Sequence, residues 1–275
     1  MSRLKDRINK KFTFCLYDAA NFESSVNSMH LRFFIALLLS GLLPSAHAVS
    51  DDDLNLIDAA GRGDLRIFKM MLEMGANPNA LDKGGNSALV KATVASQRDF
   101  VRRLLELHSD VNVQGSLGVT PIGAAAMRGD SEIVKMLLNA GAHPDVRDST
   151  GATPLLNALR FQRDTNFRLL LEAGADADMA DTQGETPLMA AAQMGRSDYV
   201  DALLAKSADP SLIGKEGVTA LYYAIFEGYE DIAQKLVQAG ASVHGLNNGY
   251  SPLHWAQVMG REKVVPLLVS AGARE

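Results

Sequence analysis

The chain has 275 residues and a formal net charge of −5, with 47% hydrophobic and 21% charged residues. This composition supplies enough apolar material for a packed core and excludes global disorder. It leaves open one large domain, two ordinary domains or an array of small units, so the order of the residues must decide.

Residues 29–48 have the order of an export signal. Arg32 precedes the apolar run of residues 33–43, and the small residues Ala46 and Ala48 follow it. The run of such a signal enters the membrane and small side chains fit the peptidase, so we expect cleavage after Ala48. A membrane anchor is the alternative, but the run has about 11 residues and a spanning helix needs roughly 20.

Residues 1–28 form a polar preface that is unusually long for an export signal, so we expect translation to start at Met29. If translation starts at Met1, the preface is a long basic head that is removed with the rest. The only cysteine, Cys15, lies in this preface. A mature chain without thiols suits an oxidising compartment.

Removal of residues 1–48 also changes the charge of the chain. This segment holds six basic and three acidic residues, so the formal net charge goes from −5 to −8. An acidic chain without a cluster of Lys and Arg is a poor ligand for phosphate backbones and anionic membranes. We therefore expect no nucleic-acid partner, and contact with a membrane only during export.

Two markers recur along the remaining chain with a common period. The first marker is a serine or threonine at Ser87, Thr120, Thr153, Thr186, Thr219 and Ser251. Successive positions are 33 residues apart, except for the last two, which are 32 apart. A turn residue keeps the same spacing at Gly75, His108, Gly141, Gly174, Ser207, Gly240 and Gly272. A period in this range is the signature of a repeat architecture, in which each unit packs on its neighbours.

The repeated unit contains two helices and a loop. Thr186 is expected to cap the first helix, and Pro187 fits its first turn, where a missing N–H costs nothing. Gly195 lies where this helix should end with a positive φ; Ser96 and Gln162 replace glycine there in other units. Apolar residues at helical spacing follow, as in residues 199–204, and predict a second helix. A stretch rich in Asp, Asn and Gly then predicts a hairpin-like finger.

These patterns predict an all-α repeat solenoid over residues 49–275, an array of helix-turn-helix units joined by hairpin-like fingers. About seven units are expected, at residues 53–79, 80–112, 113–145, 146–178, 179–211, 212–244 and 245–275. No unit of this size buries its apolar face alone, so each copy provides the surface on which its neighbour packs.

The units resemble the ankyrin repeat family. Its phrase G-x-T-P-L-H-x-A-A-x-x-G is visible in GVTPIGAAAMRG, GATPLLNALRFQ, GETPLMAAAQMG, GVTALYYAIFEG and GYSPLHWAQVMG. The resemblance covers about residues 53–275, and the first unit lacks the Thr-Pro step, as an N-terminal cap can. Only His254 keeps the family's histidine. Pro266 lies early in the last outer helix, where it either fits the first turn or frays the helix.

The resemblance implies a binding scaffold without catalytic chemistry, whose fingers and first helices line a concave groove that holds a partner protein. The sequence contains no phosphate-binding loop, no nucleophile elbow and no Cys or His pair at metal-ligand spacing. His108 and His143 are interpreted as turn residues, and the recurring Asp148 and Asp181 as loop residues that bond to their own backbone. We expect no enzyme activity, cofactor, metal or small-molecule substrate.

Positions that vary from copy to copy are free to meet a partner. In the fingers they are Lys83, Asn86, Leu117, Val119, Thr150, Gln183, Glu185, Lys215, Glu216, Asn248 and Tyr250, and on the first helices Arg128, Arg160, Phe161, Gln193, Met194, Phe226, Glu227 and Met259. Residues 222–255 hold six of the eleven aromatic residues that remain after cleavage. Aromatic side chains are typical interface anchors. The candidate protein-binding residues are therefore Phe161, Gln193, Met194, Tyr223, Phe226, Glu227, Tyr250 and Trp255.

An alternative hypothesis is that the aromatic residues have a structural role. The rings could fill space left by missing alanines, or cover the end of the stack, and Tyr222 is expected to point inward. The leading functional hypothesis is an exported adaptor that binds another protein, periplasmic if the source is a bacterium with two membranes. The alternatives are a scaffold tethered to the membrane by an uncleaved N-terminus, a masking or immunity-type protein for an enzyme, and an enzyme whose site a partner completes.

Overall fold

A computed structural model describes residues 49–274 of the chain. The chain separates into two units, Met1–Ala48 and Val49–Glu275. The expected start at Met29 and the expected cleavage site at Ala48 lie outside the described residues, so both stay predictions.

Residues 49–274 form pairs of α-helices, which we divide into inner and outer helices. The inner helices are α3 (Asp51–Arg62), α5 (Ala88–Val94), α7 (Pro121–Arg128), α9 (Pro154–Arg160), α11 (Pro187–Gln193), α13 (Ala220–Glu227) and α15 (Pro252–Val258). The outer helices are α4 (Leu65–Glu73), α6 (Arg98–Glu106), α8 (Ser131–Asn139), α10 (Asp164–Glu172), α12 (Ser197–Ala205), α14 (Glu230–Gln238) and α16 (Val264–Ser270).

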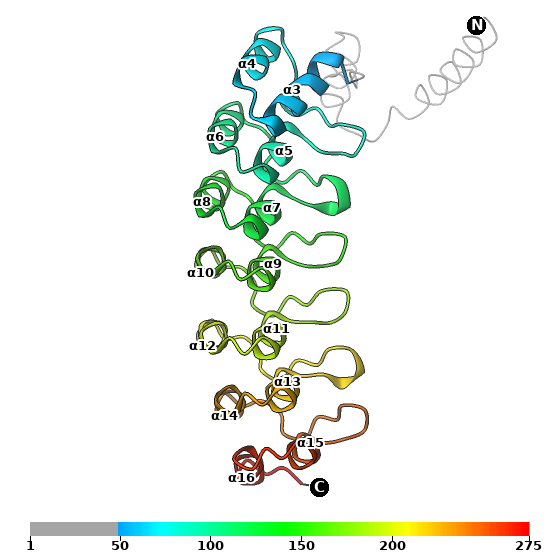
Figure 1. The fold of residues 1–275 in the computed structure, drawn as a ribbon, viewed down its shortest axis with the longest axis vertical. Coiled ribbons are helices and arrows are strands. Elements are labelled where there is room, and N and C mark those ends of the chain that lie inside the picture. The colour runs from blue at the N-terminus through cyan, green and yellow to red at the C-terminus, as the bar shows by residue number, and fades with distance from the viewer. Residues whose placement is uncertain (1–48, 275) are drawn as a thin grey trace, which may run out of the picture. The chain divides into compact units, whose positions relative to one another are not determined.

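The helix pairs are stacked in one row, and each inner helix lies between its outer helix and a finger (Figure 1). Two fingers contain a short 3-10 helix, η1 (Ser116–Gly118) and η2 (Lys215–Gly217). Among the described residues there is no β-strand, and one isolated antiparallel bridge joins Asn247 to Tyr250. The predicted all-α repeat solenoid is therefore confirmed.

The recurring hydroxyl residues cap the inner helices, as predicted. The side chain of Thr186 accepts a hydrogen bond from the amide of Met189 at 3.2 Å, and Pro187 is the first helical residue. The same cap is present at Ser87, Thr120, Thr153, Thr219 and Ser251. Each cap satisfies a backbone N–H that would otherwise have no partner at the start of its helix.

A residue in the left-handed conformation follows every inner helix, as expected from the recurring glycine. Ser96 and Gln162 adopt this conformation too, with φ of 55° and 54°. The glycine is also needed for space at Gly195, where a Cβ would collide with the ring of Tyr229 from the next repeat. The two exceptions therefore keep the turn at the expense of backbone strain.

A continuous core runs along the stack. Each outer helix from α6 to α14 places one completely buried leucine at the same point, at Leu104, Leu137, Leu170, Leu203 and Leu236. Burial of a leucine stabilises a fold by about 1.5–3 kcal/mol. The alanines of the inner helices, such as Ala191 and Ala192, are also completely buried and keep neighbouring helices close.

A ladder of hydrogen bonds, which the sequence did not predict, joins one repeat to the next. A side-chain oxygen at the base of each finger accepts the N–H of a residue 31 positions later. The pairs are Asn79 with Asp110, Asn112 with His143, Asp145 with Asp176, Asp178 with Asp209, and Ser211 with Ser242, at 2.9–3.0 Å. These bonds satisfy backbone donors in exposed turns and set the spacing of the units.

The two ends of the stack differ from its middle. At the start, Ser50 and Asp53 form a reciprocal capping box, so α3 begins at Asp51 without the Thr-Pro step. At the end, α16 begins only at Val264, because Pro266 has no N–H to donate to the carbonyl of Glu262. Pro266 is thus accommodated in the first turn of a shortened helix.

Within residues 49–274, no helix is both long enough and apolar enough to span a membrane.

Candidate binding surface

An aromatic cluster lies on the inner helices and finger of the last two repeats. We define it as Tyr222, Tyr223 and Phe226 of α13, Tyr250 of the last finger, and His254 and Trp255 of α15. Trp255 lies at its centre, since its ring centroid is 5.5 Å from that of Tyr222, 6.4 Å from Phe226 and 5.8 Å from Tyr250. These contacts are edge-to-face, a favourable arrangement for aromatic rings.

The cluster is only partly buried. Phe226 is 41% exposed and Tyr250 is 48% exposed, whereas Trp255 is half-buried and its indole Nε1 donates to the carbonyl of Asn247 at 3.4 Å. The His254 ring stacks on Tyr250, with ring centroids 4.4 Å apart. The centre of the cluster is therefore held in place, while two of its rings present apolar surface to solvent.

The expectation that Tyr222 points inward is wrong. Tyr222 is half-buried, and its ring stacks on Phe226 at 5.7 Å. In the preceding units this position is held by the buried residues Leu156 and Met189, whose side chains are covered. A tyrosine ring is larger than either side chain and reaches the surface, where it joins the cluster.

Next to the cluster, between the fifth and sixth repeats, lies a cleft of about 400 Å³. It is lined by Arg160, Asp181, Gln183, Gly184, Glu185, Met189, Gln193, Gly214, Lys215, Glu216, Val218 and Tyr223. We call this space the cleft. Tyr223 belongs to both features, because it lines the cleft and its ring centroid is 5.8 Å from that of Tyr222. The cleft and the cluster therefore form one continuous surface of inner helices and fingers.

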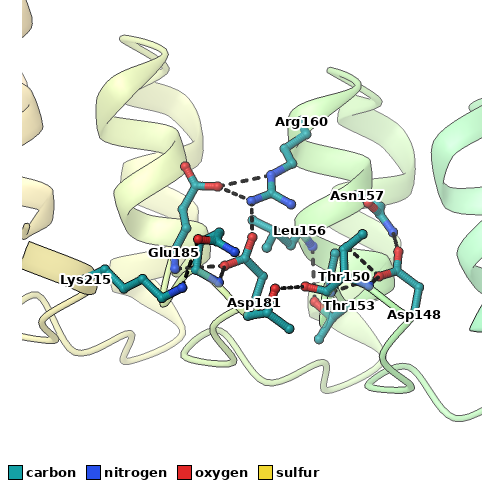
Figure 2. Close-up of polar contacts among 12 residues, drawn as sticks. Asp148, Thr150, Thr153, Leu156, Asn157, Arg160, Asp181, Glu185 and Lys215 are labelled. Atoms are coloured by element: carbon teal, nitrogen blue, oxygen red, sulfur yellow. Dashed lines mark hydrogen bonds and ion pairs between the residues drawn. The ribbon is translucent and has the colours of Figure 1, made fainter.

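Arg160 lines the cleft, and its side chain reaches from α9 to Asp181 and Glu185 of the next repeat (Figure 2). Its Nη2 donates to the Asp181 carboxylate at 2.6 Å, and both Nε and Nη2 donate to Glu185. The side chain of Asp181 is 5% exposed. The expectation that Arg160 is free to meet a partner is wrong, because both neighbouring carboxylates engage it.

The pKa values of this ion-pair group reflect competing effects. Burial alone would raise the pKa of Asp181, but hydrogen bonds from Arg160 and from the amides of Glu185 and Gln183 together hold it below its ordinary value. For Arg160, burial lowers the pKa, and the hydrogen bonds to Asp181 and Glu185 raise it above its ordinary value. Asp181 and Arg160 are therefore both charged near neutral pH.

The hydroxyl of Tyr223 lies in a negative field. Its pKa is raised first by burial, and then by the charges of carboxylates that include Glu185, Asp181 and Glu227. Glu227 also contributes to the raised pKa of Tyr222, where burial is again the larger cause. Carboxylates of one finger and of one inner helix, α13, therefore act on the same part of the surface.

Asp148 and Asp181 are confirmed as loop residues. Asp148 accepts hydrogen bonds from the amides of Thr150 and Ala152 at 2.8 and 3.1 Å, and Asp181 is bonded in the same way within its own finger (Figure 2). The finger before α13 has Gly214 instead of Asp. It forms η2, with Glu216 at its tip in the left-handed conformation, φ 60°.

Two of the histidines, His108 and His143, lie in the connections that follow outer helices. His108 is a turn residue with φ 58°, and His143 donates its backbone N–H to the side-chain oxygen of Asn112 in the preceding repeat. Within the described part of the chain, no group of three or more His, Cys, Asp or Glu residues is arranged to hold a metal ion.

The candidate residues predicted from sequence lie in three places. Tyr223, Phe226, Tyr250 and Trp255 form most of the aromatic cluster, and Gln193 lines the cleft. Glu227 is exposed directly after Phe226. Met194 is half-buried against the core, and Phe161 is 50% exposed at the end of α9, two repeats before the cluster.

Several residues of this surface were not among the binding residues predicted from the sequence, namely Tyr222, His254, Asp181, Met189 and Val218. Tyr222 and His254 occupy one register position, the third residue after the capping hydroxyl. This position is buried in earlier units, as at Val90 and Met189. The side chains of these two residues lie against Gly115 and Gly214 of the following finger, so the position faces the following repeat. The last unit has no follower, so its residue is exposed.

An array of stacked helix pairs, with one continuous surface of fingers and inner helices, defines a repeat scaffold of the binding type. The chain belongs to the ankyrin repeat family. The family model for ankyrin repeats (3 copies) matches residues 56–148, 98–181, 122–213, 168–247 and 208–274. Repeats of this family generally mediate protein–protein interaction, and its members are typically non-enzymatic binding scaffolds. A comparison with curated proteins finds no match to this chain.

Proposed function

We propose that this chain is an exported adaptor that binds a partner protein through the surface formed by its fingers and inner helices. The observation that carries the proposal is the aromatic cluster, which is packed at its centre and exposed at Phe226 and Tyr250. It adjoins the cleft, so anchoring rings and polar groups lie side by side. Interfaces commonly combine central aromatic anchors with a polar rim.

The rigidity of Phe226 favours binding. An aromatic side chain has two rotatable bonds, and Phe226 is already restrained by its contacts with Tyr222 and Trp255. A partner that covers these rings would remove apolar surface from water at little further cost in conformational entropy. Truncation of such an anchor typically weakens binding by 2 kcal/mol or more, that is, about 30-fold.

Export is proposed from the order of residues 29–48, with a basic head, an apolar run and small residues that end at Ala48. Mass spectrometry of the N-terminus of the protein from an exported fraction tests this part directly. A chain that begins at Val49 supports it, and an intact apolar segment in the membrane fraction replaces it with the tethered scaffold.

Partner binding is tested by capture from the exported fraction with wild-type protein and the variants Phe226→Ala and Tyr250→Ala. The matched control is Met74→Ala, which removes an apolar side chain that is 60% exposed at the end of α4 in the first repeat. We expect one dominant partner, lost with either cluster variant and kept with the control. Equal capture by all folded variants would refute the proposed surface.

The identity of the captured protein separates two forms of the proposal. If it is an enzyme that loses activity on binding, the chain is a masking or immunity-type protein. If its activity is unchanged, the chain is an adaptor in the stricter sense.

A further inference from the structure

More negatively charged than positively charged side chains surround Tyr223. Four carboxylates, those of Asp181, Glu185, Glu216 and Glu227, line or act on the surface, together with the two cations Arg160 and Lys215.

Both cations are engaged. Arg160 is bonded to Asp181 and Glu185, and Lys215 donates to the side-chain oxygen of Gln183 at 2.9 Å, which ties one finger to the next. Glu216 and Glu227 are exposed at the tip of a finger and at the end of α13. Lys215 is exposed as well, and its bond to a neutral amide leaves its charge in place. The exposed charges of this surface, those of Lys215, Glu216 and Glu227, therefore sum to −1.

Arg160 is not available to an acidic partner. If its guanidinium moved to a new carboxylate, Asp181 would keep its charge at 5% exposure without its counter-ion. An isolated charge in such a position is strongly disfavoured. An acidic segment would therefore meet the exposed carboxylates of Glu216 and Glu227, and of the two cations only Lys215 could turn to it.

We propose that the cleft and the aromatic cluster together take a peptide segment with a Lys or Arg side chain next to an apolar one. This inference rests on the proposed function and specifies its partner. The cation lies at the acidic part of the surface, near Glu216 and Glu227 and against the Tyr223 ring, whose face attracts cations. The apolar side chain covers Phe226 and Trp255.

The two subsites are contiguous, which makes a single short segment sufficient. Tyr222 and Tyr223 are consecutive in α13, and their rings are in contact with the cluster and the cleft respectively. A cation and an apolar side chain that are neighbours in an extended segment can thus meet both subsites. Opposite charges at the rim would also speed association and make it sensitive to salt.

The test is a selection of binding peptides from a random display library on the full chain, followed by affinity measurements. The fluorescence of Trp255 reports binding directly, because it is the only tryptophan in the chain and lies in the cluster. We expect the enriched peptides to carry Lys or Arg beside an apolar residue.

The double variant Glu216→Gln/Glu227→Gln should weaken such a peptide about tenfold and reduce the effect of salt on its affinity. The matched control is Glu73→Gln/Glu172→Gln, which changes the net charge equally at exposed positions of two outer helices. The control should leave the affinity unchanged.

The remaining outcomes separate this inference from the proposed function. If the enriched peptides are acidic or uncharged but lose affinity with Phe226→Ala, the inference is wrong and the proposed surface stands. If Glu216→Gln/Glu227→Gln has no greater effect than its control, the inference is again wrong. If no peptide is enriched, or binding does not depend on Phe226, the inference and the proposed surface both fail.

Discussion

Arg160 should be important to the stability of the stack, and its replacement by alanine tests the packing of repeats four and five. In the wild type it holds the carboxylates of Asp181 and Glu185, and its own side chain is 31% exposed. Asp181 is 5% exposed in the wild type, and Arg160→Ala leaves it with only two backbone amides, those of Gln183 and Glu185, as donors.

The expected cost lies between two reference cases. Removal of one partner of a buried ion pair costs about 3–5 kcal/mol, and removal of one partner of an exposed pair costs about 0–1 kcal/mol. Because Asp181 is buried but Arg160 is partly exposed, we expect Arg160→Ala to lower the free energy of unfolding by about 1–3 kcal/mol. In a domain of this size, each kcal/mol corresponds to a fall in Tm of about 2–4 °C.

The loss should depend on pH, in a direction set by Asp181. Its pKa is lowered in the folded state, so its contribution to stability is present above the ordinary carboxyl pKa of about 4. That contribution is lost as the pH falls through the folded-state pKa. In Arg160→Ala the pKa of Asp181 rises, so the difference between wild type and variant should be largest above pH of about 4 and shrink at lower pH.

The assay is denaturant unfolding at several pH values, with Arg62→Ala as the control. Arg62 pairs with Asp58 at 3.0 Å within α3, and both side chains are more than half exposed. The control should lose no more than about 0.5 kcal/mol. If Arg160→Ala loses no more stability than Arg62→Ala, or if its loss grows as the pH falls, the ion-pair reasoning is refuted.

Three further substitutions test the turns and caps by thermal unfolding. Gln162→Gly should raise stability by about 1 kcal/mol, because the wild-type residue is held at φ 54°; a lower Tm would contradict this. Gly217→Ala should lower the Tm more than Gly141→Ala. Both glycines have positive φ, but only at Gly217 would a Cβ collide with the carbonyl oxygen of Leu246. Equal falls in Tm would show that this collision has no effect on stability. Thr153→Ala should cost about 1 kcal/mol through the lost helix cap, and no loss would show that the cap is dispensable.

The fold was predictable from the sequence wherever its cause is local. A capping hydroxyl such as Thr186 bonds to an amide three residues later, and the turn at Gly195 depends on the φ of a single residue. These capping and turn residues recur in each unit, so the repeat period and the ends of the inner helices could be predicted from the sequence. Even the shortened α16 follows from one missing N–H, that of Pro266.

Contacts between repeats could not be predicted in the same way. The bond from the Asp110 amide to Asn79, and the group around Arg160, join residues more than 20 positions apart. They depend on the distance and rotation between units, which the sequence period does not specify. For this reason Arg160 was expected to be free, and the missed ring of Tyr222 was expected to be inside.

The candidate surface was predicted in part. The exposed anchors Phe226 and Tyr250 were identified because aromatic residues replace smaller ones at repeated positions. The cleft could not be predicted from the sequence, because its lining residues come from three inner helices and two fingers that are separate in the chain. The balance of its charges could not be predicted either, because it depends on the pairing of Arg160 with Asp181 and Glu185 across two repeats.

The central claim is that a partner protein lies against the aromatic cluster. Its most direct test is photo-crosslinking in cells, with a photoreactive phenylalanine at the position of Phe226 in one variant. A second variant carries it at Arg168, which is exposed on the outer helix α10. We predict one crosslinked partner from position 226 and none from position 168. Crosslinks of equal yield from both positions, or from position 168 alone, would contradict the account.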